Sequence, residues 1–154
     1  MDLALELLME LSKNDNMMWV VGSGDVVSEN NSEGIKEPEV SDRFMTIEAD
    51  NWHFHVGLDS ISSIQFVESQ SHGDLLSYYV RFSNDTADKE ETLVRSYFPN
   101  PYLDADSKRT ELQPEKLRAF EEMRDKYVGR EEGIVFVQRT RRDERTKGPP
   151  PVAL

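Results

Sequence analysis

Short runs in which apolar and polar residues alternate fill much of the middle of this 154-residue chain. Alternation of this kind places successive side chains on opposite faces of a strand and is typical of antiparallel sheets with one buried face. Asp50-Asn51 and the segment DTADKE separate neighbouring runs and predict two hairpins. The predicted strands are RFMTIEAD (43–50), WHFHVGL (52–58), SSIQFVESQ (62–70), LLSYYVRFSN (75–84) and ETLVRSYF (91–98).

Two amphipathic segments lie on either side of these strands. Leu3, Leu7 and Leu11 recur at helical spacing within DLALELLMELS (2–12). A second helix is predicted over 114–128, because Pro114 suits a first turn and Gly129 suits a helix end. Its apolar stripe consists of Leu117, Phe120, Met123 and Tyr127. Two further strands are expected in MMWVVGSGDVV (17–27) and IVFVQ (134–138).

This order predicts a single α+β domain over residues 1–138, with a large antiparallel meander sheet flanked by N- and C-terminal helices. Residues 28–42 are polar and acidic, and we expect a mobile loop there. Residues 139–154 combine basic residues with a proline-rich end, and we expect a disordered tail that could contact an acidic partner protein.

Composition excludes several classes of protein. The chain has no cysteine, which excludes disulfides, Cys-ligated zinc and iron–sulfur clusters. Its formal net charge of −12 opposes binding to nucleic acid. The start of the sequence has no signal-peptide pattern, and no apolar run approaches the roughly 20 residues of a membrane helix. We therefore expect a soluble cytoplasmic protein without membrane insertion.

The strand WHFHVGL holds two of the three histidines. Alternation places His53, His55 and Gly57 on one face, opposite the apolar residues of the strand. The two imidazoles are either incidental polar residues on an exposed face or ligands. Followed by Asp59, they also resemble the first metal-binding motif of cupins, which has a glutamate where this chain has Asp59. Cupins also need a second motif with another histidine, and the only further histidine, His72, lies in a different setting. A cupin-like metal-dependent enzyme using His53 and His55 is thus one candidate.

A longer pattern begins at this strand and covers roughly residues 43–128. Its phrases are HVGLDSISSIQFVES, then YYVRFSND, then TELQPEKLRAFEEMRD. In order and spacing they resemble the intracellular haem-utilisation carriers of the ChuX/HutX type, and each half of the larger HemS-type proteins. Two features depart from that pattern: the family's short link between the last hairpin strand and the helix is expanded here into PNPYLDADSKR, and the N-terminal third has no match. The matching positions are His55, Asp59, Ile64, Phe66, Val67, Glu68, Tyr79, Arg81, Phe82, Asn84, Glu111, Leu112, Pro114, Glu115 and Phe120.

The resemblance implies a haem-binding sheet face, with haem b as the cofactor, and often a homodimer. His55 matches the family's ligand histidine, and His53 lies beside it. His and Tyr are the residue types here that can ligate haem iron, so His72 is a candidate for a further iron ligand. Arg81 and Arg95, on neighbouring predicted strands, could bind the propionates, with Tyr79 on the face of Arg81.

We expect a haem carrier or a haem-dependent regulator of a partner protein. The chain could instead be a haem-degrading enzyme or a non-haem protein-interaction domain. The sequence has no flavin or nicotinamide motif that would favour an enzyme.

Overall fold

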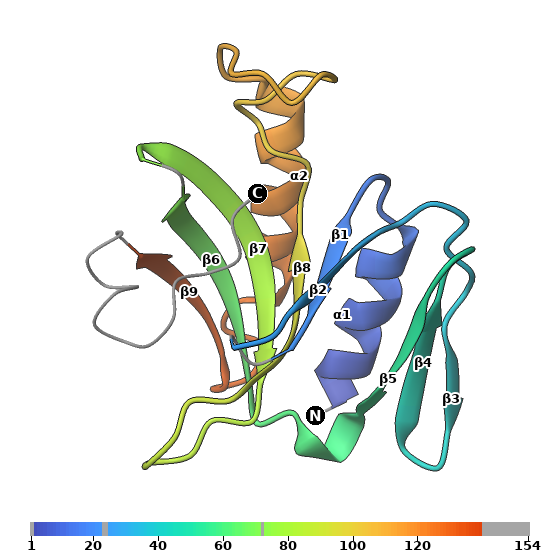
Figure 1. Ribbon diagram of the computed structural model, residues 1–154. Helices are drawn as coiled ribbons and strands as arrows, with labels where there is room; N and C mark the ends of the chain where they lie inside the picture. The colour runs from blue at the N-terminus through green and yellow to red at the C-terminus, as the bar shows by residue number, and fades with distance from the viewer. Residues whose placement is uncertain (1, 23–24, 72, 140–154) are drawn as a thin grey trace.

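The computed structural model describes residues 2–22, 25–71 and 73–139. It confirms the predicted α+β fold, with a helix near each end and mainly antiparallel strands between them (Figure 1). In chain order the elements are α1 (Asp2–Lys13), β1 (Met18–Val21), β2 (Ser28–Asn31), β3 (Glu39–Ser41), β4 (Phe44–Glu48), β5 (His53–Gly57), the 3₁₀ turn η1 (Leu58–Ser60), β6 (Ser63–Ser71), β7 (Leu75–Ser83), β8 (Thr92–Tyr97), α2 (Pro114–Tyr127) and β9 (Ile134–Arg139).

The strands form two sheets, which corrects the prediction of one large meander. The larger sheet has the order β2-β1-β8-β7-β6-β9, and the smaller has the order β3-β4-β5. β5 pairs with β4, and the chain then passes through η1 before it enters β6 in the larger sheet. Most pairs are antiparallel as expected, but β9 runs parallel to β6 because the chain crosses through α2 before it returns.

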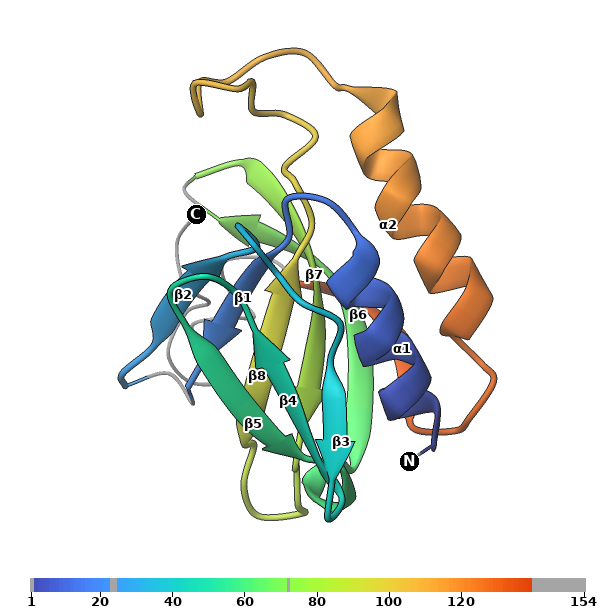
Figure 2. The same ribbon diagram turned by 90° about the vertical axis from the view of Figure 1, so that its right-hand side faces the viewer.

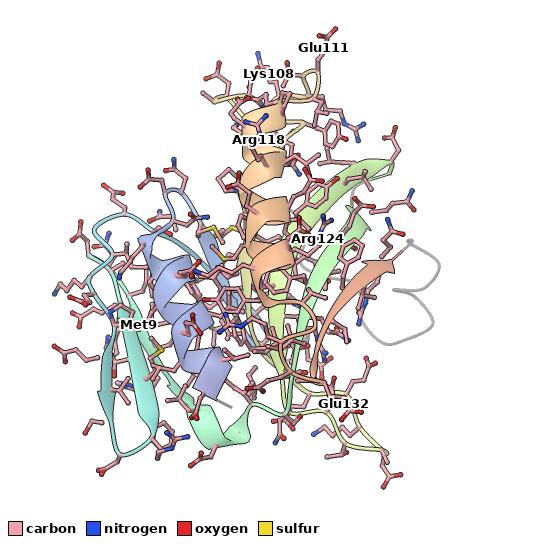
Figure 3. All side chains as sticks on the ribbon, turned by 180° about the vertical axis from the view of Figure 1, so that it is seen from behind. Met9, Lys108, Glu111, Arg118, Arg124 and Glu132 are labelled. Carbon is pink, nitrogen blue, oxygen red and sulfur yellow. The ribbon has the colours of Figure 1, made fainter. Side chains whose placement is uncertain are left out.

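The main core lies between the larger sheet, the helices and the inner face of the smaller sheet. From behind, Figure 3 shows α1 between the smaller sheet and α2, and Figure 2 shows the smaller sheet beside α1. The predicted leucine stripe of α1 and the aromatic stripe of α2 both enter this core. Trp19 of β1 contacts Phe54 of β5, with ring centroids 5.9 Å apart. The inner faces of the two sheets therefore face each other.

Residues 28–42, predicted to be a loop, contain two short strands. β2 pairs with β1, and β3 pairs with β4. Both strands lie at the edge of their sheets and expose most of their side chains, which explains why their composition resembles that of a loop. In the segment between β2 and β3, the Lys36 N–H donates a hydrogen bond to the Glu48 carbonyl at 2.8 Å. This bond attaches the segment to β4.

Polar contacts join the two helices across the core edge. The Tyr127 hydroxyl donates to the Glu10 carboxylate at 2.8 Å, and Lys126 forms an ion pair with the same carboxylate. Arg130, just beyond α2, pairs with Glu6 at 3.1 Å. In Figure 3, Arg124 lies on the side of α2 that faces β9, where its guanidinium is 5.1 Å from the centroid of the Phe136 ring.

Neither helix in the described part of the chain has the length and apolar composition that a membrane crossing requires. Of the predicted tail 139–154, Arg139 is the last residue of β9, and the rest lies outside the described residues.

Candidate functional site

The two histidines of β5 lie on the exposed face of the smaller sheet, as the alternation predicts. His53 and His55 are exposed, whereas Val56 is buried and Phe54 packs against the core. The imidazole centroids are 5.4 Å apart, with the ring planes at 66°. Both rings therefore project from one face of a single strand and cannot bind opposite sides of one metal ion.

Thr46 of β4 holds the ring of His55. The hairpin register pairs Thr46 with His55 and Glu48 with His53. Thr46 Oγ1 and His55 Nδ1 are 2.7 Å apart, a hydrogen-bond distance. When Nδ1 donates to the hydroxyl, Nε2 carries the free lone pair and is the nitrogen available to a metal. A partner on the second ring nitrogen is how proteins orient histidine ligands.

An aromatic ring occupies the space beside Gly57 that the sequence led us to expect to be open. A Cβ atom at Gly57 would lie 3.4 Å from Cε1 of Phe44, the residue opposite it in the register. Phe44 is itself 54% exposed. The histidine face therefore carries an exposed aromatic ring, which can contact the flat surface of a ligand.

Two ion pairs flank this face. Lys36 Nζ lies 3.1 Å from the Glu48 carboxylate, and Arg43 Nη2 lies 2.8 Å from Asp59 Oδ1. The hydrogen bond from Arg43 holds the pKa of Asp59 below its ordinary value. Both pairs are solvent-exposed, and such pairs contribute little to stability. Either cation can therefore exchange its partner for an anionic group of a ligand.

The other predicted binding residues lie on the larger sheet. Arg81 and Tyr79 of β7 pair in register with Arg95 and Tyr97 of β8, so all four share one face. Tyr79 and Tyr97 are buried, and their ring centroids are 4.6 Å apart. Together with Val20 and Val67 they form a second apolar cluster, separate from the main core.

Arg81 is fully engaged within the protein. Its Nη1 and Nη2 donate to the two oxygens of Asp85 at 2.8 and 2.9 Å, and its Nε donates to Thr92 Oγ1 at 2.7 Å. Its side chain is 3% exposed. This guanidinium is part of a buried ion pair and is not available to a propionate.

The structure does not bring the predicted arginines to the histidines. Trp19 and Phe54 meet between the sheets, so the inner faces of β1 and β5 point toward each other. Arg95 is level with Val20 on the opposite face of the larger sheet, and His55 lies on the opposite face of the smaller one. A single ligand on His55 therefore cannot contact Arg81, Arg95 or Tyr79. His72 lies outside the described residues.

The cupin-like arrangement is not formed either. Within residues 2–22, 25–71 and 73–139, no three His, Asp or Glu side chains gather as a metal site. Asp59, the expected carboxylate, lies in η1 and binds Arg43.

Two residues that matter for these sites escaped the sequence prediction. Thr46 could have been found, because a hairpin turning at Asp50-Asn51 places it opposite His55. Asp85 lies beyond the end of β7, and no periodic pattern assigns its carboxylate to Arg81.

A protein-family model matches residues 5–128, and its description, “-like:-like”, names no activity. The chain belongs to this family. No curated protein matches the chain.

Solved structures show the same fold at low sequence identity. Protein AGR_C_4470 from Agrobacterium tumefaciens is 22% identical, with a TM-score of 0.58 over 82% of this chain and 66% of its own. Two structures of ChuX, one titled as the heme binding protein ChuX, are each 14% identical, with TM-scores of 0.56 and 0.55. They cover 77% and 79% of this chain and 69% of their own. The chain thus spans about two thirds of the length of the proteins it matches, and at these identities the likeness establishes the fold.

Proposed function

We propose that this protein binds haem, with the His55 imidazole as the axial ligand of the iron. The observation that carries this proposal is the exposed His55 ring whose Nδ1 is held by Thr46 Oγ1 at 2.7 Å. Imidazole is a common axial ligand of haem iron. The fold likeness to a protein titled as heme binding supports the choice of haem over a bare metal ion.

Haem bound on β5 would also use the neighbours of His55. The exposed Phe44 ring offers apolar contact to the porphyrin. Lys36 and Arg43, on either side of the histidine face, are the cations that could receive the propionates in place of Arg81 and Arg95. A sixth ligand would have to come from another segment, such as the one containing His72, or from a second copy of the chain in a homodimer.

A haemin titration followed by the Soret band tests this proposal. We expect His55→Ala to shift the Soret band and to weaken haem binding at least about tenfold, the equivalent of 1.4 kcal/mol. His53→Ala is the matched control, because His53 is also exposed on the same face of the same strand. Both variants should keep the circular dichroism spectrum of the parent. If His53→Ala alone changes the Soret band, the ligand assignment is wrong, and if neither does, the histidine face is not the haem site.

Thr46→Val should weaken haem binding about 10-fold or more while leaving the iron–imidazole bond in place, because Thr46 acts through the orientation of His55. The readout is the haem dissociation rate together with a Soret position close to that of the parent. Thr46→Ser, which keeps the hydroxyl, should restore the rate. A Thr46→Val variant that releases haem at the parent rate would contradict the positioning role.

Carrier, regulator and enzyme are then distinguished with the haem-loaded protein. We propose a carrier or haem-dependent regulator, so haem should pass to apomyoglobin or alter binding of a partner protein. Conversion of the haem to a bilin with reductant and oxygen would favour the haem-degrading enzyme. Absence of haem binding, with a partner protein bound, would leave an interaction domain.

A further inference from the structure

His53 is the histidine of β5 that the proposed haem site leaves unused. The porphyrin occupies the equatorial positions of haem iron and leaves axial positions to the protein, so only one of two neighbouring imidazoles can bind the iron from one side. His53 nevertheless lies on the same exposed face as His55, and the two ring centroids are 5.4 Å apart. The pair of rings is therefore a feature of this face that binding of haem through His55 does not explain.

The distance between the two rings matches that of two imidazoles bound to one tetrahedral metal ion. Zinc–nitrogen bonds are about 2.0–2.1 Å long, which places the centroids of two imidazoles on one tetrahedral zinc ion about 5.2 Å apart. Two imidazoles at adjacent corners of a square-planar ion would need centroids about 4.5 Å apart. The observed 5.4 Å is close to the tetrahedral separation. The two rings cannot bind opposite sides of one ion, but they can bind adjacent positions of a tetrahedral one.

One of the two rings is already oriented for a metal ion. Thr46 Oγ1 lies 2.7 Å from His55 Nδ1, and when Nδ1 donates to the hydroxyl, Nε2 keeps the lone pair that binds a metal. His53 is exposed, so its ring can turn to direct a nitrogen toward the same ion without disturbing the core. Because both side chains are open to solvent, water can fill the other positions of the ion.

The ligand type selects the class of metal ion. Imidazole suits zinc, copper and nickel, whereas calcium and magnesium prefer oxygen ligands. No third His, Asp or Glu side chain joins the two histidines in the part of the chain that the structure describes, so the protein would supply two ligands. The formal net charge of −12 attracts cations to the surface of the chain.

We propose that His53 and His55 together bind one divalent transition-metal ion in the haem-free protein, and that zinc is the ion whose geometry fits best. The metal site itself does not depend on haem binding. It uses His55 Nε2, the atom proposed to bind haem iron, so zinc and haem exclude each other on this face. This exclusion rests on the proposed haem function.

Calorimetric titration of the whole 154-residue, haem-free chain, prepared without a histidine tag, with zinc chloride tests the metal site. We expect one ion per chain, and His53→Ala and His55→Ala should each reduce zinc affinity at least about tenfold. Both side chains are exposed, so both variants should keep the circular dichroism spectrum of the parent. Zinc affinity that is unchanged in either variant, or magnesium chloride binding that also needs both histidines, would overturn the site.

Two further variants test whether the two imidazoles are the only protein ligands. His72→Ala removes the third histidine of the chain, and Asp59→Asn removes the carboxylate that a cupin-like site would use. Asp59 lies in η1 and binds Arg43, so both variants should leave zinc affinity unchanged. A clear loss of affinity in either variant would overturn the two-imidazole site.

The variant His53→Ala separates the zinc site from the haem site. It should bind haem as the parent does, because His55 is intact, but it should have lost the zinc site. Zinc at about ten times its dissociation constant should therefore weaken haem binding about tenfold in the parent and much less in His53→Ala. Zinc that binds the parent without weakening haem binding would overturn the exclusion and place haem away from His55. If the parent binds no haem, the proposed function fails, and the zinc titration alone still decides the metal site.

Discussion

Replacing Asp85 by alanine should lower the free energy of unfolding by about 3–5 kcal/mol, the range for removing one partner of a buried ion pair. Arg81 would be left buried with its two strongest hydrogen bonds broken. The Glu91 N–H and the Ser83 hydroxyl would lose an acceptor as well. Urea unfolding measures the loss. Asp74→Ala is the matched control, because its pair with Arg109 is exposed, and it should change the free energy of unfolding little.

The same ion pair predicts a dependence of stability on pH. Burial alone would raise the pKa of Asp85, but hydrogen bonds from Arg81, the Glu91 N–H and Ser83 outweigh it and hold the pKa below its ordinary value. A carboxyl whose pKa is lowered on folding stabilises the protein above its unfolded pKa, about 3.9, and loses this contribution as pH falls through the folded pKa. Asp85→Asn should therefore differ most from the parent near neutral pH and least at strongly acidic pH. If the difference in free energy of unfolding between Asp85→Asn and the parent were the same at neutral and at strongly acidic pH, this prediction would be wrong.

The sequence predicted both helices and most of the strands, though not β2 and β3, because the determinants of those elements are local. Each strand from β4 to β8 is an alternating run that ends at turn residues, and each helix carries its own apolar stripe. The outward direction of His53 and His55 follows from the same alternation and is seen in the structure. The hairpin register that brings Thr46 to His55 is also local, because the turn between β4 and β5 fixes it.

The arrangement of the sheets depends on contacts between distant segments and was not predictable in the same way. Nothing within β5 indicates that β4 is its single partner among the described strands, or that η1 separates it from β6. The sequence placed Arg81 and Arg95 on adjacent strands, which the register confirms. The sequence did not indicate whether the sheet face that carries the two arginines points toward the smaller sheet or away from it. The histidines and the arginines consequently appeared to share one site, whereas they lie on opposite outer faces of two sheets packed together.

Phe120→Ala should also lower the free energy of unfolding by about 3–5 kcal/mol, the range for truncating a buried phenylalanine. Phe120 is 1% exposed, and it is where α2 meets the larger sheet. Its ring lies 5.1 Å from that of Tyr78, 5.4 Å from that of Phe98 and 5.9 Å from that of Phe66. Removing the Phe120 ring leaves a cavity between these three rings. Each of the three belongs to a strand of the larger sheet or directly follows one, so the rings cannot close the cavity unless the sheet itself moves.

Urea unfolding, with the midpoint and the slope measured separately, checks this expectation. The midpoint should fall while the slope stays near that of the parent, because the cavity lowers stability without changing the surface exposed on unfolding. Phe44→Ala makes the same substitution at a phenylalanine that is 54% exposed, and it should change the midpoint little. Equal losses for the two variants would mean that α2 does not anchor to the sheet through Phe120. A small loss for Phe120→Ala alone would mean that the surrounding rings close the cavity.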